Sequence, residues 1–430
     1  MEQKKTNIRW YILALLFIAT TLLYIDRAAL GIMAPYLQDK IGWTEKQYGY
    51  ITSSFMIGYA ICFLIMGRLI DRFGSRKGYM LSMGLWSIAQ LAHSLVSSWI
   101  GFAISRFSLS IGQSGNFPVA IKTVTEWFPK KERALAVGIF NGGANVGTMI
   151  APLVIPALVL FFDSWRVAFL WTFPIAMIWI VFWALLYSKP EQNRKVNAAE
   201  RDYIMSDTEE ATAEEATTEV ATTQKVSYLK LLNYRAMWAI LVGKFLADPV
   251  WWFYLFWGAK YLYTKFGLNL SEIGLPFFTI YLVSWGGGIC LGWLSSKLMK
   301  QGNRLNRGRK LSMLACAVCA LPVMFVPHVE HVWAAVALIA VAAGGHCGWS
   351  ANIFSLMGDV FPKKVTASVS GLGGVAGAMG GIIAPMLIGM VLQDAGAEGY
   401  LIPFTVAAFA YFIALAIIQI LLPRVQPIKM

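Results

Sequence analysis

The stretch EWFPKKERALAVGIFNGGANVGTMIAPLVI, residues 126–155, decides the fold because residues 359–388 repeat its pattern 233 positions later. The two stretches align without a gap and share 11 identities in 30 positions. They include the tetrapeptide Phe-Pro-Lys-Lys at residues 128–131 and again at residues 361–364. Since each copy lies at the same place in its half of the chain, the repeat indicates a duplicated helical unit. Parallel repeats of this kind are related by an axis along the membrane normal and enclose a binding site.

The chain is too hydrophobic for a water-soluble protein, because 57% of its 430 residues are hydrophobic and only 14% are charged. Apolar runs of about 18 or more residues are typical of helices that cross a bilayer. The sequence therefore predicts an all-α membrane protein with twelve transmembrane helices in two pseudo-symmetric six-helix bundles. The predicted spans are residues 10–30, 47–68, 78–97, 99–122, 134–160, 165–187, 236–263, 272–298, 309–328, 331–357, 366–393 and 399–423.

One long polar segment divides the spans six and six. Residues 188–235 include TEEATAEEATTEV, which has too little apolar surface to fold alone and is interpreted as a solvated linker. The predicted organisation is an N-terminal six-helix bundle at residues 1–187, a cytoplasmic linker at 188–235 and a C-terminal six-helix bundle at 236–430.

The net charge of +13 is a signal of topology. Of the 36 lysines and arginines, 27 lie in the two tails, in the loops after even-numbered spans or at the span ends that adjoin these loops. By the positive-inside rule, both termini and these loops are expected in the cytoplasm. The distribution argues against a nucleic-acid-binding surface and predicts a multi-pass protein of the bacterial inner membrane.

No group of residues suggests catalysis or metal binding. The four histidines are scattered, and the five cysteines all fall inside predicted helices. A nucleotide-binding P-loop is absent from the sequence. We therefore expect no enzyme activity, no cofactor, no metal and no nucleic-acid partner, and a monomer in the lipid bilayer.

The loop GRLIDRFGSRK, residues 67–77, follows the second predicted span. It resembles the signature loop of the major facilitator superfamily, and this resemblance implies a latch that closes and releases the two bundles. The alternative interpretation is a plain basic anchor at the cytoplasmic surface. The gating residues that match the motif are Gly67, Asp71, Arg72, Gly74, Arg76 and Lys77.

Six further stretches resemble the anion:cation symporter family of this superfamily, and within it the hexuronate and sugar-acid transporter branch. The resemblance implies import of a sugar acid anion, such as galacturonate, glucuronate or a related aldonate, by proton symport with alternating access. It also implies a small organic anion and protons as partners. The stretches are RWYILAL from residue 9, YIDRAAL from 24, GNFPVAIKTVTEWFPKKERALAVGIFN from 115, AERDYI from 199, FLADPVWWF from 245 and GWSANIFSLMGDVFPKK from 348.

Ionisable residues inside apolar helices are costly and are therefore functional candidates. Arg27 resembles the family arginine that pairs with the substrate carboxylate, and Asp26 resembles the family's proton-binding carboxylate. Arg106, in the fourth span, is expected at the same depth as Asp26, so a direct ion pair between them is predicted. The alternative is a fixed pair that only orders the two helices.

The chain departs from the family at Gln113, where the sugar-acid symporters have a glutamate that takes part in proton coupling. A glutamine cannot titrate, so three interpretations stay open: Asp26 acts alone, another acid replaces the glutamate, or transport is uncoupled. An engineered substitution is a further possibility. Asp248, four residues after Lys244, is the candidate replacement, although the two residues also suit a neutralised structural pair.

A sugar acid needs hydroxyl partners and an aromatic surface in addition to its carboxylate site. Polar and aromatic residues near the middle of the spans are candidates for these contacts. Together with Arg27, the predicted substrate-binding residues are Tyr24, Tyr59, Asn141, Asn145, Trp252, His346, Ser350 and Asn352. His346 is either a proton relay or a hydrogen-bonding core residue. An uncoupled or exchange-type organic-anion transporter of the same fold is the alternative function.

Overall fold

The computed structural model describes residues 6–205, 228–300 and 305–428, and within these ranges the chain forms helices and no strand. The N-terminal group of helices comprises α1 Ile8–Ile41, α2 Glu45–His93, α3 Trp99–Gln113, α4 Asn116–Trp127, α5 Lys130–Phe162, α6 Val167–Leu170 and α7 Thr172–Leu186. The C-terminal group comprises α9 Tyr228–Leu232, α10 Arg235–Phe266, α11 Gly274–Lys300, α12 Leu305–Ala320, α13 Val332–Val360, α14 Lys363–Ala395 and α15 Leu401–Leu421. Three short 3₁₀ segments are η1 Pro190–Gln192, η2 Leu321–His328 and η3 Gly396–Tyr400.

The prediction of an all-helical membrane protein is confirmed. Eight helices of the described chain are long and apolar enough to cross a membrane, or nine if a bent pair within α2 forms one span. The second and third predicted spans both fall in α2. The eleventh and twelfth predicted spans fall in the stretch Ser368–Leu421, which counts as one of the eight. The count of twelve stays a prediction, and the helix boundaries are compatible with it.

Local chemistry explains several helix boundaries. Thr44 begins α2 with a capping box, in which its side chain accepts from the Gln47 amide and the Gln47 side chain accepts from the Thr44 amide. Gly74, inside the loop motif, has φ 77° and interrupts α2 where two separate spans were predicted. The repeated tetrapeptide places Pro129 before α5 and Pro362 before α14, both in extended conformations, so the duplication reproduces the same helix start.

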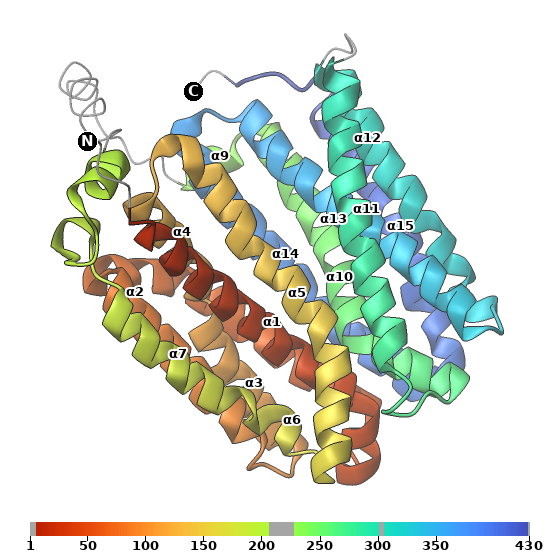
Figure 1. Cartoon of the computed structure of the whole chain (residues 1–430). Helices are drawn as coiled ribbons and strands as arrows, with labels where there is room; N and C mark the ends of the chain where they lie inside the picture. Colours follow the sequence, from red (N-terminus) through yellow and green to blue (C-terminus); the bar gives the residue numbers. More distant parts are fainter. Residues whose placement is uncertain (1–5, 206–227, 301–304, 429–430) are drawn as a thin grey trace.

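The two groups of helices lie side by side (Figure 1). The first described residues of the chain and the first residues of the linker lie at the same end of the molecule. We call this the terminal end, and the opposite one the far end. Contacts between the groups gather toward the far end. There the Tyr48 hydroxyl of α2 donates to the Phe256 carbonyl of α10 at 2.6 Å, and Lys260 of α10 pairs with Glu45 and Gln38.

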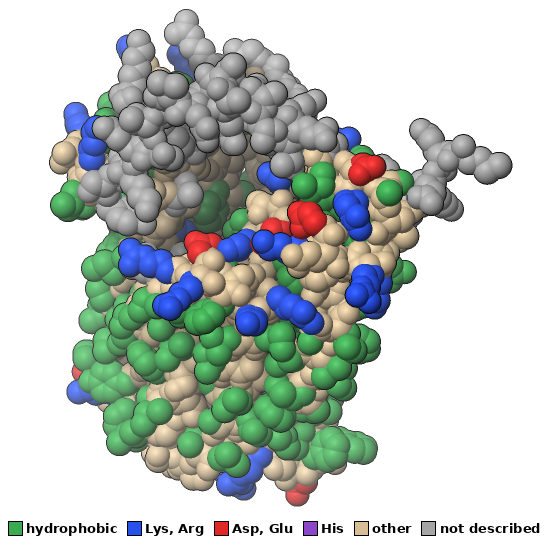
Figure 2. Space-filling model, turned by 90° about the vertical axis from the view of Figure 1, so that its left-hand side faces the viewer, with side chains coloured by type: hydrophobic (Ala, Val, Ile, Leu, Met, Phe, Trp, Pro, Cys, Tyr) green, Lys and Arg blue, Asp and Glu red, His purple; other side chains and the backbone are tan. Residues whose placement is uncertain are grey.

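A band of hydrophobic side chains crosses the face of the molecule that Figure 2 shows, and lysines and arginines gather above it near the terminal end. Exposed large side chains such as Ile88, Phe161 and Leu185 belong to the α2, α5 and α7 surfaces. Such a band is expected where the surface of a membrane protein contacts the hydrocarbon region of the bilayer.

The described start of the linker is attached to the N-terminal group. Residues 198–205 are helical, and the fully buried Glu200 accepts from the main-chain amides of Ile8 and Arg9 at 2.9 and 3.2 Å. A carboxylate at this place satisfies unpaired donors at the start of α1 and complements the helix dipole. Residues 206–227 of the predicted linker, including TEEATAEEATTEV, lie outside the described residues.

Glycines of the repeated stretch allow close helix packing. A Cβ added at Gly147 of α5 would lie 2.4 Å from the Thr21 carbonyl of α1, whereas one added at Gly138 meets nothing within 4 Å. In the second repeat, a Cβ at Gly377 of α14 would lie 1.9 Å from a carboxylate oxygen of Asp248 in α10. Gly147 thus lets the backbones of α5 and α1 approach closely, and Gly377 leaves room for the Asp248 side chain. Small residues have this role in membrane helices.

Gly147→Ala is expected to destabilise the protein by about 1–3 kcal/mol, because the added methyl group collides with the α1 backbone. Gly138→Ala is the matched control on the same helix and should change stability by less than about 0.5 kcal/mol. Thermal unfolding of the detergent-purified variants, followed by tryptophan fluorescence, measures the difference. Equal transition temperatures for the two variants would contradict the packing at Gly147.

Candidate functional site

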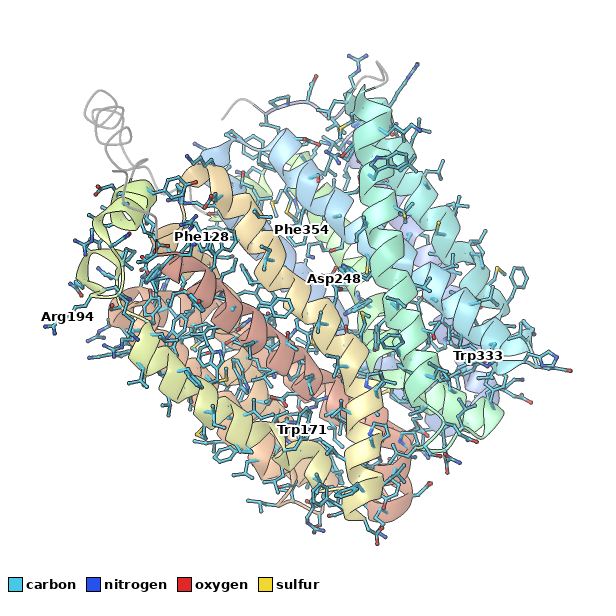
Figure 3. The ribbon with its side chains drawn as sticks, viewed as in Figure 1. Phe128, Trp171, Arg194, Asp248, Trp333 and Phe354 are labelled. Carbon is cyan, nitrogen blue, oxygen red and sulfur yellow. The ribbon has the colours of Figure 1, made fainter. Side chains whose placement is uncertain are left out.

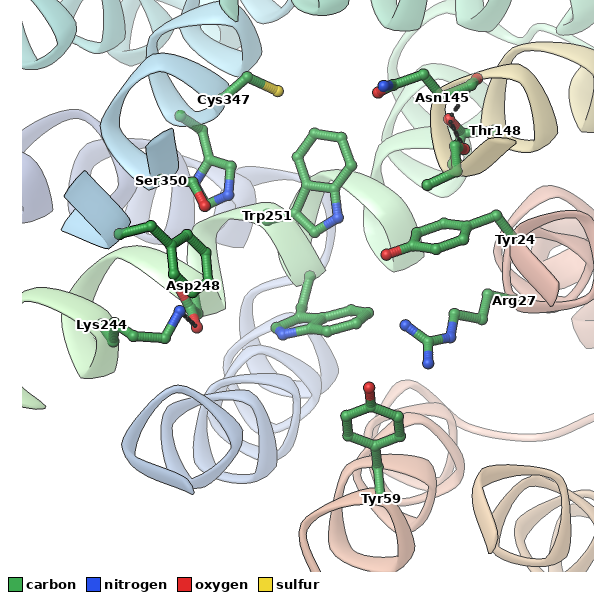
Figure 4. Close-up of a pocket in the computed structure, with 14 residues that line it drawn as sticks. Tyr24, Arg27, Tyr59, Asn145, Thr148, Lys244, Asp248, Trp251, Cys347 and Ser350 are labelled. Atoms are coloured by element: carbon green, nitrogen blue, oxygen red, sulfur yellow. Dashed lines mark hydrogen bonds and ion pairs between the residues drawn. The ribbon is translucent and has the colours of Figure 1, made fainter. Parts of the chain in front are cut away.

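A cavity of about 410 Å³ lies between the two groups of helices. Both groups contribute to its wall, and Figure 4 shows their side chains facing one another across it. The lining residues are Tyr24 and Arg27 of α1, Tyr59 of α2, Ala144, Asn145 and Thr148 of α5, Lys244, Asp248, Trp251 and Trp252 of α10, and His346, Cys347, Ser350 and Phe354 of α13. Its size suits one small organic molecule.

Arg27 is the cation that the N-terminal group presents to this cavity, and it is only 3% exposed. Its guanidinium carbon lies 4.8–5.9 Å from the centres of four aromatic rings, which belong to Tyr24, Phe55, Tyr59 and Trp252. One terminal nitrogen, Nη2, is buried without a hydrogen-bond partner among the described residues. Since buried guanidinium donors are normally paired, this nitrogen can donate to an anion in the cavity.

Gln113 holds Arg27 in place. The Arg27 Nε donates to Gln113 Oε1 at 2.8 Å, and Gln113 is fully buried. The Gln113 amide nitrogen donates to the Leu23 carbonyl of α1 at 3.4 Å. Because the amide is neutral, it orients the guanidinium without cancelling its charge.

The predicted ion pair between Asp26 and Arg106 is wrong for this structure. Arg106 donates to main-chain oxygens of α1, namely those of Arg27 at 3.0 Å and Asp26 at 3.5 Å. The Asp26 side chain lies instead beside Thr172 of α7 and Trp86 of α2, with Oδ1 unpaired among the described atoms. The two residues share a depth, as predicted, but the rotation of α1 turns the carboxylate away from α3.

Lys244 and Asp248 form the second charged group of the cavity. Their side chains pair at 2.8 Å, one helical turn apart on α10, and Lys244 also lies 5.0 Å from the Phe354 ring centre. Figure 4 shows this pair across the cavity from Arg27, with Trp251 between them. Figure 3 places Asp248 and Phe354 between the two groups, away from both ends.

His346 lines the cavity but already has structural partners. Its Nδ1 lies 2.9 Å from the Tyr411 hydroxyl of α15, and its ring stacks on Trp251 with centres 5.3 Å apart. These contacts are those of a hydrogen-bonding core residue, and they hold Trp251 against the wall.

The structure brings most of the predicted substrate-binding residues into the cavity and leaves two out. Asn352 is buried within the C-terminal group, where its side-chain oxygen accepts from Ser295 at 2.9 Å and from Arg309 at 3.2 Å. Its prediction as a lining residue is wrong because it faces α11 and α12, two positions beyond Ser350. Asn141 is half-buried one turn of α5 away from Asn145 and does not line the cavity.

Sequence reasoning did not identify several lining residues, among them Ala144, Thr148, Cys347 and Phe354. Thr148 follows Asn145 by three positions and therefore shares its helix face. Its hydroxyl donates to the main-chain oxygens of Ala144 and Asn145, so its lone pairs remain available to a ligand donor.

The predicted gating loop lies in the middle of α2, at the terminal end of the molecule, and contributes no residue to the cavity wall. Asp71 pairs with Lys122 of α4 at 2.9 Å, and Arg76 donates to the Ala184 carbonyl of α7. Arg72, Arg76 and Lys77 are exposed, and Gly67 has open space around it. All these contacts stay within the N-terminal group, so the role in gating remains a prediction.

A family model described as the Major Facilitator Superfamily matches residues 16–385. The chain is 29% identical over 396 residues to the hexuronate transporter of Escherichia coli (strain K12), covering 92% of this chain and 90% of that protein. It is 33% identical over 273 residues to the galacturonate transporter of Dickeya chrysanthemi, covering 63% of this chain and 77% of that protein.

A solved structure has the same overall architecture. It is that of a bacterial homolog to the human lysosomal transporter Spinster in an inward-facing and unoccupied conformation. The TM-score is 0.76 at 19% identity, with 96% of this chain and 97% of that chain covered, so the likeness concerns the fold.

Arg27→Lys is expected to weaken anion binding by about tenfold to a hundredfold. A lysine has no planar guanidinium, whose several nitrogens can donate to Gln113 and to the ligand at the same time. Isothermal titration with galacturonate measures the change. Arg194→Lys, at an exposed position on the linker, is the control and should bind as the parent does. Equal affinity of all three proteins would mean that Arg27 is not the anion site.

Proposed function

The chain belongs to the major facilitator superfamily, and we propose that it imports a sugar acid anion across the bacterial inner membrane together with protons. It is a multi-pass membrane transporter and not an enzyme. The observation that carries the proposal is the buried Arg27, which presents an unpaired guanidinium nitrogen to a cavity between the two groups of helices.

The charges of the cavity support a substrate with one carboxylate. Among its lining residues the charged ones are Arg27, Lys244 and Asp248, and the last two neutralise each other at 2.8 Å. One positive charge therefore remains for the ligand. A hexuronate or aldonate fits this balance, and the named substrates of the two relatives, hexuronate and galacturonate, agree with it.

The remaining lining residues suit a polyhydroxylated chain. Tyr24, Tyr59, Asn145 and Ser350 supply groups that donate to and accept from hydroxyls, while Trp251 and Trp252 supply aromatic faces for C–H groups. Such a mixture of aromatic walls and a few polar groups is usual for small-molecule sites.

The proposed transport cycle is alternating access between two bundles, at residues 1–187 and 236–430, joined by the linker at 188–235. We assign the terminal end to the cytoplasm because most lysines and arginines lie there. The contacts at the far end then close the outer side, so that this conformation receives or releases substrate on the cytoplasmic side.

Proton coupling is assigned to Asp248 and Asp26. Protonation of Asp248 would release Lys244 from its pair and change the charge balance at the cavity wall. Asp26 is a buried carboxylate directly beside Arg27 in the sequence, and Arg106 holds the α1 backbone at both residues. Gln113 has only an orienting role, since an amide does not titrate.

An uncoupled or exchange-type organic-anion transporter is the second candidate, and Gln113 is the observation that favours it. A glutamate at this position would lie against Arg27 and link anion binding to protonation, and glutamine removes that link. Asp248 is the residue that distinguishes the candidates, because it is the titratable acid lining the cavity.

Uptake of labelled galacturonate into proteoliposomes tests the proposal. With an alkaline interior, the parent protein should accumulate the substrate several-fold above equilibrium, and Asp248→Asn should lose accumulation while keeping counterflow exchange. Asp163→Asn, at the far end of α5, is the control and should accumulate as the parent does. Uptake by the parent that ignores the imposed pH gradient would overturn proton symport and support the second candidate.

Gln113→Glu is expected to make anion binding depend on pH. An ionised glutamate would neutralise Arg27 and compete with the substrate carboxylate, so affinity falls by about tenfold or more at alkaline pH. Protonation in acid removes this competition and restores binding. Titrations between pH 5 and 9 measure the effect, and the parent protein should show a flatter profile. Identical profiles would contradict the placement of Gln113 against Arg27.

Lys260→Met is expected to shift the protein toward the conformation open at the far end. The substitution leaves Glu45 half-buried without its cation, and loss of one partner of a buried pair costs about 3–5 kcal/mol. Spin labels at positions 46 and 265, in a cysteine-free background, report the opening as a longer distance. Lys40→Met, exposed at the same end, is the control. An unchanged distance distribution would show that the pair does not hold this conformation.

A further inference from the structure

A second hollow lies between α12 and α15 of the C-terminal group. Figure 1 shows where these two helices lie. Its volume is about 590 Å³, and it shares no lining residue with the cavity described above. The lining residues of each helix are spaced by three and four positions, so they lie on one face of that helix. On α12 these are Arg307, Lys310, Leu311 and Leu314, and on α15 they are Phe412, Leu415, Ala416 and Gln419, with Asn306 completing the wall. We call this hollow the α12/α15 groove.

The α12/α15 groove is polar at one end and apolar along the rest. The two helices are antiparallel, so Arg307 at the start of α12 and Gln419 near the end of α15 both lie toward the terminal end. Asn306 and Lys310 lie at the same level. Farther along, the wall consists of the apolar members, of which Leu311 and Leu314 are 47% and 39% exposed. The lining residues include two cations and no acid.

The polar end is an ordered site. Lys310 Nζ donates to the carbonyls of Leu422 and Pro423 at 2.9 and 2.7 Å, and thereby satisfies unpaired acceptors just after α15. Asn306 accepts from the Val425 amide at 2.9 Å, which ties the segment after α15 to the start of α12. Arg307 is exposed and makes no hydrogen bond or ion pair with the described part of the chain.

The depth of the groove matches the boundary between headgroups and acyl chains. From Arg307 to Leu314 the α12 axis rises about 10 Å, which spans a phosphate, a glycerol unit and the first methylenes of an acyl chain. Both helices belong to segments long and apolar enough to cross a membrane. The groove therefore opens toward lipid, and its cations lie where phosphates are found.

We propose that the α12/α15 groove binds one anionic phospholipid. The phosphate accepts from Arg307 and from the remaining donor of Lys310, Gln419 donates to the glycerol or ester oxygens, and one acyl chain lies along Leu311, Leu314 and Phe412. Basic pockets between membrane helices recognise anionic headgroups in this way. The acyl chain of a zwitterionic lipid would contact the apolar wall equally well. Its headgroup carries no net charge, however, and would not neutralise Arg307 and Lys310.

Binding of the lipid would connect α12 to α15 and to the segment that follows α15. The groove shares no lining residue with the substrate cavity, so the proposal is independent of which anion is transported. Its consequence is a protein whose stability depends on the headgroup charge of the surrounding lipid.

The test is retention and stabilisation by defined lipids. Delipidated full-length protein in a neutral detergent is titrated with phosphatidylglycerol, phosphatidylcholine or inorganic phosphate, and followed by thermal unfolding and by native mass spectrometry. Phosphatidylglycerol should raise the transition temperature and remain bound as one molecule. Arg307→Gln should weaken this binding about fivefold, and Arg307→Gln with Lys310→Gln about thirtyfold.

Two further variants separate the site from general effects. Arg194→Gln with Lys195→Gln removes two exposed charges from the linker and should leave binding unchanged. Ala416→Trp fills the apolar part of the groove with the cations intact and should also weaken phosphatidylglycerol binding. Equal stabilisation by phosphatidylcholine, or an equal effect of inorganic phosphate, would overturn the proposal. So would unchanged binding by both the Arg307→Gln and the Ala416→Trp variants.

Discussion

The burial of one guanidinium without a carboxylate partner is the constraint on which the site depends. A buried charge costs several kcal/mol unless its surroundings compensate for it. In this protein the compensation comes from four aromatic rings and from the neutral amide of Gln113, and none of these removes the positive charge of Arg27. The protein therefore keeps a cation whose best counter-ion is a ligand. This arrangement links the packing of α1, α2, α3 and α10 to anion recognition.

The duplicated fold gives the two halves similar backbones and different chemistry. Related proline starts open α5 and α14, and glycines of the same repeat let α5 approach α1 and α14 approach α10. The N-terminal group contributes the unpaired Arg27, whereas the C-terminal group contributes the neutralised pair of Lys244 and Asp248. In the proposed mechanism the N-terminal half binds the anion, and protons act at Asp248 in the C-terminal half and at Asp26 in the N-terminal half. Motion between the halves would then change how the two sets of groups face each other.

Glutamine at position 113 separates two tasks that a carboxylate would combine. A glutamate would orient Arg27 and also neutralise it until a proton arrived. The amide orients Arg27 and leaves its positive charge without a counter-ion. In the proposed mechanism the proton dependence then comes from another acid, and Asp248 lines the same cavity. In this proposal, the choice of an amide or a carboxylate at position 113 determines whether anion binding at Arg27 depends directly on protonation.

Hydropathy and the internal repeat, both readable from the sequence, determined that the chain is an all-helical membrane protein, and hydropathy marked Arg27 as an ionisable residue inside a span, which the structure places in the cavity wall. They also indicated Tyr24, Tyr59, Asn145 and Trp252, because distance along a span converts directly into depth. The rotation of each helix was decided only by tertiary packing. Helices that are apolar all round carry little information about which face meets a neighbour. For this reason Asn352 turns into the C-terminal group, the Asp26 carboxylate turns away from Arg106, and Thr148 joins the cavity wall.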